Sequence, residues 1–213
     1  MKPPHEHSLT RREWLGAPAL VTAAAHAPAA PTEFQIACMT LPYAAFPLER
    51  ALQGIARVGY KYVAWGVTHK TSSGQTAEVL AVDAPPSAAR ELADRSRNLG
   101  LEPVMMFANV QMEAPESANA HARRIKQAAA AKVPFLLTFG NTRGGPYDTW
   151  IRNLKQLGPL ARDAGVTIVI KQHGGNSGTG KLCAKILRDV ADDGVRMFYD
   201  AGNNLWYNND DPI

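Results

Sequence analysis

Short apolar segments alternate with amphipathic helical segments from Phe34 onward, and this alternation constrains the fold more than any other feature. The expected strands cover Phe34–Thr40, Tyr62–Val67, Pro103–Ala108, Phe135–Phe139, Thr167–Ile170 and Arg196–Tyr199. The expected helices cover Pro47–Val58, Pro86–Asn98, Ala118–Ala131, the segment from Trp150 to Ala161 and the segment from Leu182 to Val190. Strict alternation with short connections predicts an α/β fold, a parallel sheet covered by helices.

Glycines mark the expected helix ends, because glycine adopts the left-handed conformation that commonly ends a helix. Gly59, Gly100 and Gly165 each follow a helical segment. No Pro/Ser-rich linker divides residues 30–213, so we expect one domain there. Six strand–helix units complete an open doubly wound sheet or leave a (β/α)8 barrel two units short, and the pattern alone leaves both arrangements open.

Composition excludes some classes of function. The formal net charge of +4 is spread along the chain, and no basic run is interleaved with aromatic residues. We therefore expect no nucleic-acid partner. The two cysteines, Cys38 and Cys183, fall in an expected strand and an expected helix. Buried free thiols are favoured there over a disulfide.

Residues 1–29 resemble a twin-arginine export signal. Arg11 and Arg12 precede an apolar, alanine-rich run, and small residues offer a cleavage point after Ala25 or Ala29. The alternative is a disordered basic tail. The apolar run is too short for a permanent membrane span. The mature protein is therefore expected to be soluble, in the periplasm or outside the cell.

The stretch Thr167–Lys181 combines a buried strand, three polar residues and a glycine-rich turn. Lys171, Gln172 and His173 follow the strand directly, and a helix with Leu182, Ile186 and Val190 on one face follows the turn. Parallel α/β folds place their chemistry at the carboxyl ends of the strands. We expect a site there.

The segment Gly175–Lys181 fits the phosphate-binding pattern G-x-x-x-x-G-K between a strand and a helix. The next residue is Leu182, so the hydroxyl that would hold Mg²⁺ is missing. A nucleotide phosphatase is therefore disfavoured. The backbone N–H groups at the start of this helix could still bind a substrate anion.

Three segments resemble the xylose-isomerase-like barrel family, the sugar isomerases and epimerases related to family-2 AP endonucleases. They are ALQGIARVGYKYVAWG, VIKQHGG and Tyr199-Asp200-Ala201-Gly202-Asn203. The resemblance covers Phe34 to about Tyr207. It implies a TIM-type parallel (β/α) barrel rather than an open sheet, with about six of eight units present and the C-terminal part truncated.

The resemblance also implies an activity, isomerisation or epimerisation of a small-molecule carbohydrate by proton transfer next to a carbonyl. The family holds a divalent metal, Mn, Mg, Co or Zn, with a Glu, an Asp, a His and a second Glu. Asp200 matches the Asp ligand, but Lys171 stands at the first Glu position, and Ile213 precedes the strands that carry the other two. An ammonium in place of a carboxylate changes the local charge by two units, so we expect a divalent metal to bind far more weakly here than in the family.

Two interpretations of Lys171 remain open. In the first, its ammonium replaces part of the metal and stabilises a developing enediolate oxygen, with His173 as its catalytic partner. In the second, it forms a salt bridge with Asp200 in a carbohydrate-binding or truncated relative without catalysis.

The remaining candidates bind substrate in the functional interpretation and have a structural role in the alternative. Trp65 either lines a sugar site or packs in the core. His173 and His69 are either site residues or loop histidines. Asn203 binds hydroxyl groups or forms a turn, and Asn109 and Asn141 are weaker candidates at strand ends. Six units leave two open sheet edges, which a homo-oligomer could cover.

Overall fold

The computed structural model of the protein describes residues 34–209. By its contacts the chain divides into two units, residues 1–34 and residues 35–213, and every helix and strand of the described residues belongs to the second. The expected export signal lies outside the described residues. Within residues 34–209, no helix has the length and apolar character needed to cross a membrane.

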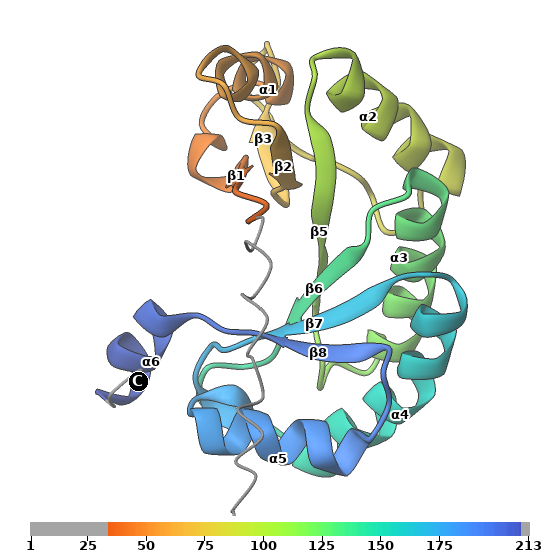
Figure 1. Ribbon diagram of the computed structural model, residues 1–213, viewed down its shortest axis with the longest axis vertical. Coiled ribbons are helices and arrows are strands. Elements are labelled where there is room, and N and C mark those ends of the chain that lie inside the picture. The colour runs from red at the N-terminus through yellow and green to blue at the C-terminus, as the bar shows by residue number, and fades with distance from the viewer. Residues whose placement is uncertain (1–33, 210–213) are drawn as a thin grey trace, which may run out of the picture. The chain divides into compact units, whose positions relative to one another are not determined.

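Six parallel strands form one sheet, and their order in the sheet is their order along the chain (Figure 1). They are β1 (Ala37–Met39), β2 (Tyr62–Trp65), β5 (Glu102–Gln111), β6 (Phe135–Phe139), β7 (Thr167–Lys171) and β8 (Val195–Phe198). In a doubly wound sheet the order reverses part-way, whereas each unit of a barrel adds beyond the last. The uninterrupted order therefore confirms the barrel-type α/β prediction, with six units present.

Helices follow the strands and, apart from the last one beyond the end of β8, line one side of the curved sheet (Figure 1). They are α1 (Leu48–Arg57), α2 (Pro86–Asn98), α3 (Ser117–Ala131), α4 (Tyr147–Asp163), α5 (Gly180–Val190) and α6 (Ala201–Asn208), with 3-10 turns at η2 (Leu41–Tyr43) and η3 (Gly175–Ser177). The glycines after α1, α2 and α4 have φ of 94°, 78° and 69° at Gly59, Gly100 and Gly165. These left-handed conformations confirm the predicted helix ends.

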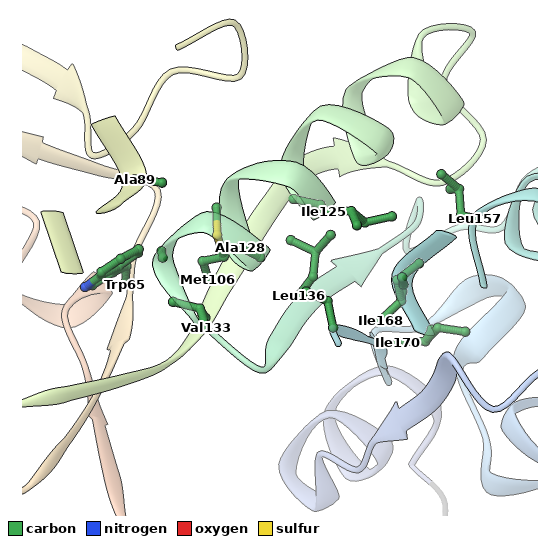
Figure 2. Close-up of a cluster of buried hydrophobic side chains, with 14 of the residues drawn as sticks. Trp65, Ala89, Met106, Ile125, Ala128, Val133, Leu136, Leu157, Ile168 and Ile170 are labelled. Carbon is green, nitrogen blue, oxygen red and sulfur yellow. The ribbon is translucent and has the colours of Figure 1, made fainter. Parts of the chain in front are cut away.

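The main core lies between the sheet and the helices, where apolar side chains from both layers interdigitate (Figure 2). Successive residues of a strand point to opposite faces. Leu136 and Ile168 therefore pack toward the helices, and Leu137 and Val169 face the other way. Fully burying a side chain of this size stabilises the fold by about 1.5–3 kcal/mol.

The second face of the sheet carries its own apolar cluster of Ala64, Met105, Leu137 and Val169. Met39, Phe107 and Phe198 pack against this cluster and are partly exposed. In a (β/α) barrel this is the interior face. Lys171 lies two residues beyond Val169, so it points to the same face at the carboxyl end of β7.

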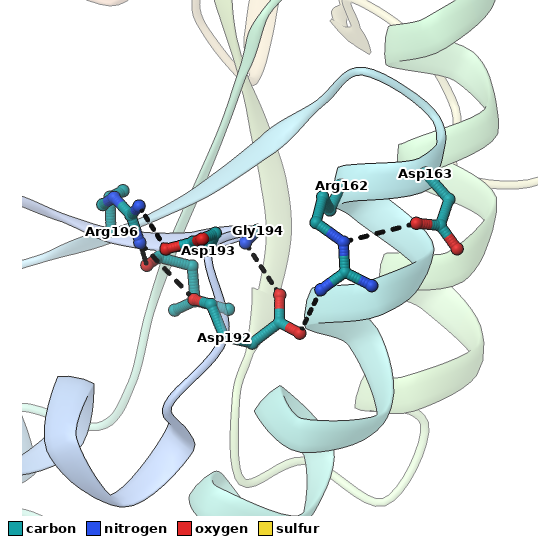
Figure 3. A network of polar contacts seen from close by, with 7 residues as sticks. Arg162, Asp163, Asp192, Asp193, Gly194 and Arg196 are labelled. Carbon is teal, nitrogen blue, oxygen red and sulfur yellow. Dashed lines mark hydrogen bonds and ion pairs between the residues drawn. The ribbon is translucent and has the colours of Figure 1, made fainter.

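An ion-pair network fixes the turn that leads into β8 (Figure 3). Arg162 of α4 binds Asp192 with an Nη1–Oδ2 distance of 2.6 Å, and the other oxygen of Asp192 accepts from Gly194 N at 2.7 Å. A side chain at Gly194 would overlap the carbonyl of Gly158 in α4. This close approach seats the start of β8 against α4.

Several local predictions are wrong. The first strand is shorter than expected, and Phe34 and Ile36 are 81% and 70% exposed. The loop that carries His69 is instead an antiparallel hairpin of β3 (Thr68–Lys70) and β4 (Thr76–Glu78). On α5, Leu182 is exposed and Cys183 takes the buried position. Both cysteines are free, as predicted, but only Cys183 is buried, and Cys38 is half-buried.

Candidate functional site

Lys171 and Asp200 meet at the carboxyl ends of two neighbouring strands. Lys171 is the last residue of β7 and pairs in register with Phe198 of β8, two residues before Asp200. Lys171 Nζ lies 3.5 Å from Asp200 Oδ2, and each side chain is 26% exposed. The structure thus brings together two of the residues that the sequence proposed for one site.

The second carboxylate oxygen of Asp200 caps the helix that follows. Asp200 is the N-cap of α6, and its Oδ1 accepts a hydrogen bond from Asn203 N at 3.0 Å. Asn203 in turn donates from Nδ2 to the carbonyl of Gln172 at 2.8 Å. An N-cap carboxylate satisfies helix N–H groups that would otherwise lack a partner. Both oxygens of Asp200 are therefore engaged.

His173 lies between two aromatic rings just beyond Lys171. Its ring meets those of Phe139 and Tyr207 edge-on, with centroids 5.6 Å and 5.2 Å away. Nε2 lies 3.3 Å from the Tyr207 hydroxyl, and Nδ1 is buried with no hydrogen-bond partner among the described residues. Burial and then the Lys171 ammonium lower the pKa of His173, so the ring is neutral at pH 7.

Ser177 in η3 holds the strand end and the glycine-rich turn in place. Its hydroxyl donates to Lys171 O at 3.1 Å and accepts from His173 N at 3.3 Å. Gly174 and Gly175 have positive φ values, and a side chain at either position would overlap the backbone of the β6–α4 loop. The glycines are therefore explained by close backbone packing.

The helix after this turn begins with an ordinary cap. Thr179 is the N-cap of α5, and its hydroxyl accepts from Leu182 N at 3.3 Å. Lys181, the lysine of the phosphate-binding pattern, is exposed.

Trp65 and His69 lie away from the Lys171–Asp200 pair. Trp65 is 1% exposed in the core on the helix side of the sheet, where its Nε1 donates to Ser96 Oγ at 3.2 Å. His69 is 3% exposed, and its Nδ1 lies 2.8 Å from the carbonyl of Phe46. Trp65 therefore has the packing role that the sequence left open, and His69 braces the β3–β4 hairpin.

The two asparagines at earlier strand ends have local partners. Asn109 has a left-handed φ of 58°, and its amide lies 3.5 Å from Glu78 Oε1. Asn141 accepts from Arg143 N through its side chain, and its own N donates to Glu113 Oε1 at 2.6 Å.

Sequence reasoning assigned no role to Gln172, Tyr207 or Glu113. Gln172 is fully buried and donates to Gly178 O and Asn204 Oδ1, both at 3.0 Å. Tyr207 reaches His173 from α6, a helix that the sequence did not predict. Glu113 holds the β6–α4 loop through Asn141 N and Trp150 Nε1. Apart from Gln172 and Gly178, these partners lie 28 to 37 positions apart, a separation that local patterns cannot reveal.

The groups around Asp200 do not fit a divalent cation. One oxygen faces an ammonium and the other a backbone N–H, and a cation would have to displace the first. Within residues 34–209, no three His, Cys, Asp or Glu side chains lie close enough to hold a metal ion.

Solved structures identify the fold. A xylose isomerase domain protein from Planctomyces limnophilus superposes with a TM-score of 0.63 at 13% identity, covering 84% of this chain and 67% of its own. The fold is that of a partial TIM barrel. A xylose isomerase-like TIM barrel protein from Mycobacterium smegmatis in complex with magnesium gives 0.62 at 14%, covering 80% and 65%. A sugar phosphate isomerase/epimerase from Parabacteroides distasonis gives 0.57 at 12%, covering 86% and 71%.

The partial TIM barrel thus spans about two thirds of the length of these structures. No family model matches the sequence, and no curated protein matches it. The TIM-type barrel that the resemblance of three segments implied is confirmed as a fold.

Proposed function

We propose that this chain acts on a sugar or sugar derivative and isomerises or epimerises it by proton transfer next to a carbonyl. The observation that carries the proposal is the Lys171–Asp200 pair beside a neutral His173, at the barrel end where such folds place their chemistry. Fold neighbours that include a sugar phosphate isomerase/epimerase support the substrate class.

In the proposed reaction His173 is the base and Lys171 binds the carbonyl oxygen. The neutral imidazole takes the proton from the carbon next to the carbonyl through Nε2, which exchanges its 3.3 Å contact with the Tyr207 hydroxyl for the substrate, since Nδ1 is buried. The carbonyl oxygen gains negative charge as an enediolate. The ammonium stabilises that oxygen, as a preorganised cation does best in a partly buried site. Isomerisation follows when the proton returns to the former carbonyl carbon while water carries the hydroxyl proton of the neighbouring carbon to the former carbonyl oxygen. Epimerisation follows when water instead donates a proton to the opposite face of the first carbon and His173 releases its proton to solvent.

The proposed site works without a metal on Asp200. Asp200 instead orients the Lys171 ammonium through Oδ2 and fixes α6 through Oδ1. α6 then supplies Tyr207, whose hydroxyl lies 3.3 Å from His173 Nε2 and orients that ring. A group held by such contacts loses little freedom at the moment of reaction.

Hydrogen exchange tests the proposal directly. In D₂O with D-fructose, proton NMR should show loss of the signals next to the carbonyl, with and without EDTA. Lys171→Gln and His173→Gln should each slow the exchange by about 100-fold. Lys181→Gln removes an exposed lysine at the start of α5 and should leave the rate unchanged. Exchange that stops with EDTA would disprove the metal-free mechanism.

The second candidate is a carbohydrate-binding protein without catalysis. It is favoured by the engagement of both Asp200 oxygens, which leaves that carboxylate with no free atom for proton transfer. This candidate predicts sugar binding by calorimetry with no exchange in D₂O over days. If neither exchange nor binding occurs with a panel of ketoses and aldoses, both candidates fail.

A further inference from the structure

A separate cavity of about 460 Å³ lies between β4, the end of β5 and the first turns of α3. Ala108, Val82 and Val110 form its apolar part. Its polar lining consists of Glu78, Asn109, Glu116, Asn119, Arg123 and Arg124. The cavity contains none of the residues assigned above to proton transfer.

Arg124 is the unusual group in this lining, because it is a buried cation without an anion. The residue is 3% exposed, and no carboxylate of residues 34–209 forms an ion pair with it. A buried charge is costly unless a counter-charge compensates it. Glu78 is the acidic group that acts on Arg124 from a distance.

Three acceptors hold the guanidinium in a fixed orientation. Nε donates to Ala108 O at 3.2 Å, and Nη1 donates to Leu80 O and to Gln127 Oε1, both at 2.9 Å. The described residues supply no acceptor for the two N–H groups of Nη2. Because Nε and Nη1 are already used, no parallel pair of donors is left, but either N–H group of Nη2 can donate to an oxygen of a carboxylate or phosphate while the guanidinium supplies the positive charge.

The first turn of α3 adds a second attraction for an anion. Glu116 is the N-cap and makes no side-chain capping bond, and the first turn contains no acidic residue. Asn119 and Ala120 of this turn line the cavity. Ser117 N and Ala120 N donate to Ala114 O and Glu116 O, so the N–H groups of Ala118 and Asn119, together with the helix dipole, favour negative charge at this point.

We propose that this cavity binds the oxyanion group of a small organic ligand, held by Arg124 and the first turn of α3. The carboxylates of Glu78 and Glu116 at the rim accept hydrogen bonds from hydroxyl groups on the rest of the ligand. The ligand class is therefore a hydroxylated phosphate ester or carboxylic acid. This site does not depend on the proposed isomerase activity.

Titration of the full chain with inorganic phosphate and with acetate, at constant ionic strength, tests the proposal and separates the two sources of oxyanion. Amide NMR shifts should change at residues 117–120, with a millimolar or tighter dissociation constant for at least one anion. Asn119→Asp adds a negative charge to an exposed cavity residue and should weaken binding about tenfold. Glu116→Gln removes a negative charge from the cavity and should strengthen anion binding severalfold.

Glu49→Gln in α1 is the matched control for a charge change at an exposed position and should leave the affinity unchanged. Because all three variants change exposed side chains, each should fold. If neither anion shifts these amides, or if Asn119→Asp binds as tightly as wild type, the proposal is wrong. The role of Arg124 would then be structural only, through its hydrogen bonds to the carbonyls of Leu80 and Ala108.

Discussion

Lys171 Nζ lies 3.5 Å from Asp200 Oδ2, across the ends of two neighbouring parallel strands. An ammonium therefore faces the carboxylate that the sequence resemblance assigns to a metal. The pair is only partly buried, so the attraction between its two charges is modest. The positive charge of Lys171 still decides which ligand the site attracts, because it repels a cation and attracts an anionic oxygen. A pair of this kind favours an oxygen that gains negative charge over a divalent cation.

The first prediction concerns the replacement of this positive charge by a negative one. Lys171→Glu places two carboxylates where the ion pair now stands, and two adjacent carboxylates attract a divalent cation. The affinity for Mn²⁺, measured by calorimetry, should rise at least about tenfold over wild type, a difference of about 1.4 kcal/mol. Lys181→Glu makes the same charge change on an exposed helix start and should have little effect. Equal affinities for wild type and Lys171→Glu would show that Lys171 does not replace a metal ligand.

The sequence predicted the elements that depend on local pattern. Alternating strands and helices and the glycines that end α1, α2 and α4 need only neighbouring residues. The proximity of Lys171 and Asp200 also followed, because the carboxyl ends of adjacent parallel strands meet. The barrel rather than the open sheet came from the resemblance, since periodicity is the same in both.

The sequence did not predict the buried face of α5 or the helix α6, and each has a physical reason. Leu182, Ile186 and Val190 drift by 80° over two intervals of four residues, because an α-helix turns about 100° per residue. Cys183 lies closer in angle to Val190 and is buried in place of Leu182. The sequence predicts no helix at α6, because Asp-Ala-Gly-Asn-Asn has low helix propensity. The Asp200 cap and the contact with His173 stabilise this helix instead.

The second prediction concerns export. If residues 1–29 are a twin-arginine signal, replacing both Arg11 and Arg12 by Lys should retain the protein in the cytoplasm of a bacterium that has this pathway. Cell fractionation and the intact mass of the envelope form provide the measurement. The wild-type form should begin after Ala25 or Ala29. Arg57→Lys, a change of the same kind in α1, should not alter export. Unchanged export of the double variant would favour a basic tail.

The third prediction compares two glycines. A side chain at Gly140 would overlap the buried ring of Trp150, which is 1% exposed and cannot move away. Gly140→Ala should lower the free energy of unfolding by about 3 kcal/mol or more, because overpacking forces backbone shifts. At Gly54 of α1 an added Cβ meets nothing within 4 Å. Gly54→Ala should raise stability by up to about 1 kcal/mol through helix propensity. Urea denaturation measures the free energy of unfolding of both variants. Similar changes in the two variants would contradict the close packing around Gly140.

The last prediction rests on His121, which is fully buried in α3. Nδ1 lies 2.8 Å from the carbonyl of Ser117, so this nitrogen carries the proton and donates. Nε2 then accepts from the hydroxyl of Thr138 at 2.7 Å. A second proton would remove that acceptor and add a charge beside Arg124. Burial is the largest cause that lowers the pKa of His121, to about 4.

The unfolded chain binds this proton more readily, with a pKa of 6.5, so protonation favours unfolding. His121 therefore contributes stability that is complete above pH 6.5 and is lost as the pH falls toward about 4. The loss amounts to about 3 kcal/mol, since each pKa unit is worth about 1.4 kcal/mol. His121→Gln cannot titrate, so its unfolding free energy should fall less over this range, and the difference from wild type should shrink as the pH drops. Parallel pH curves for the two proteins would mean that His121 is protonated as easily in the folded chain as in the unfolded one.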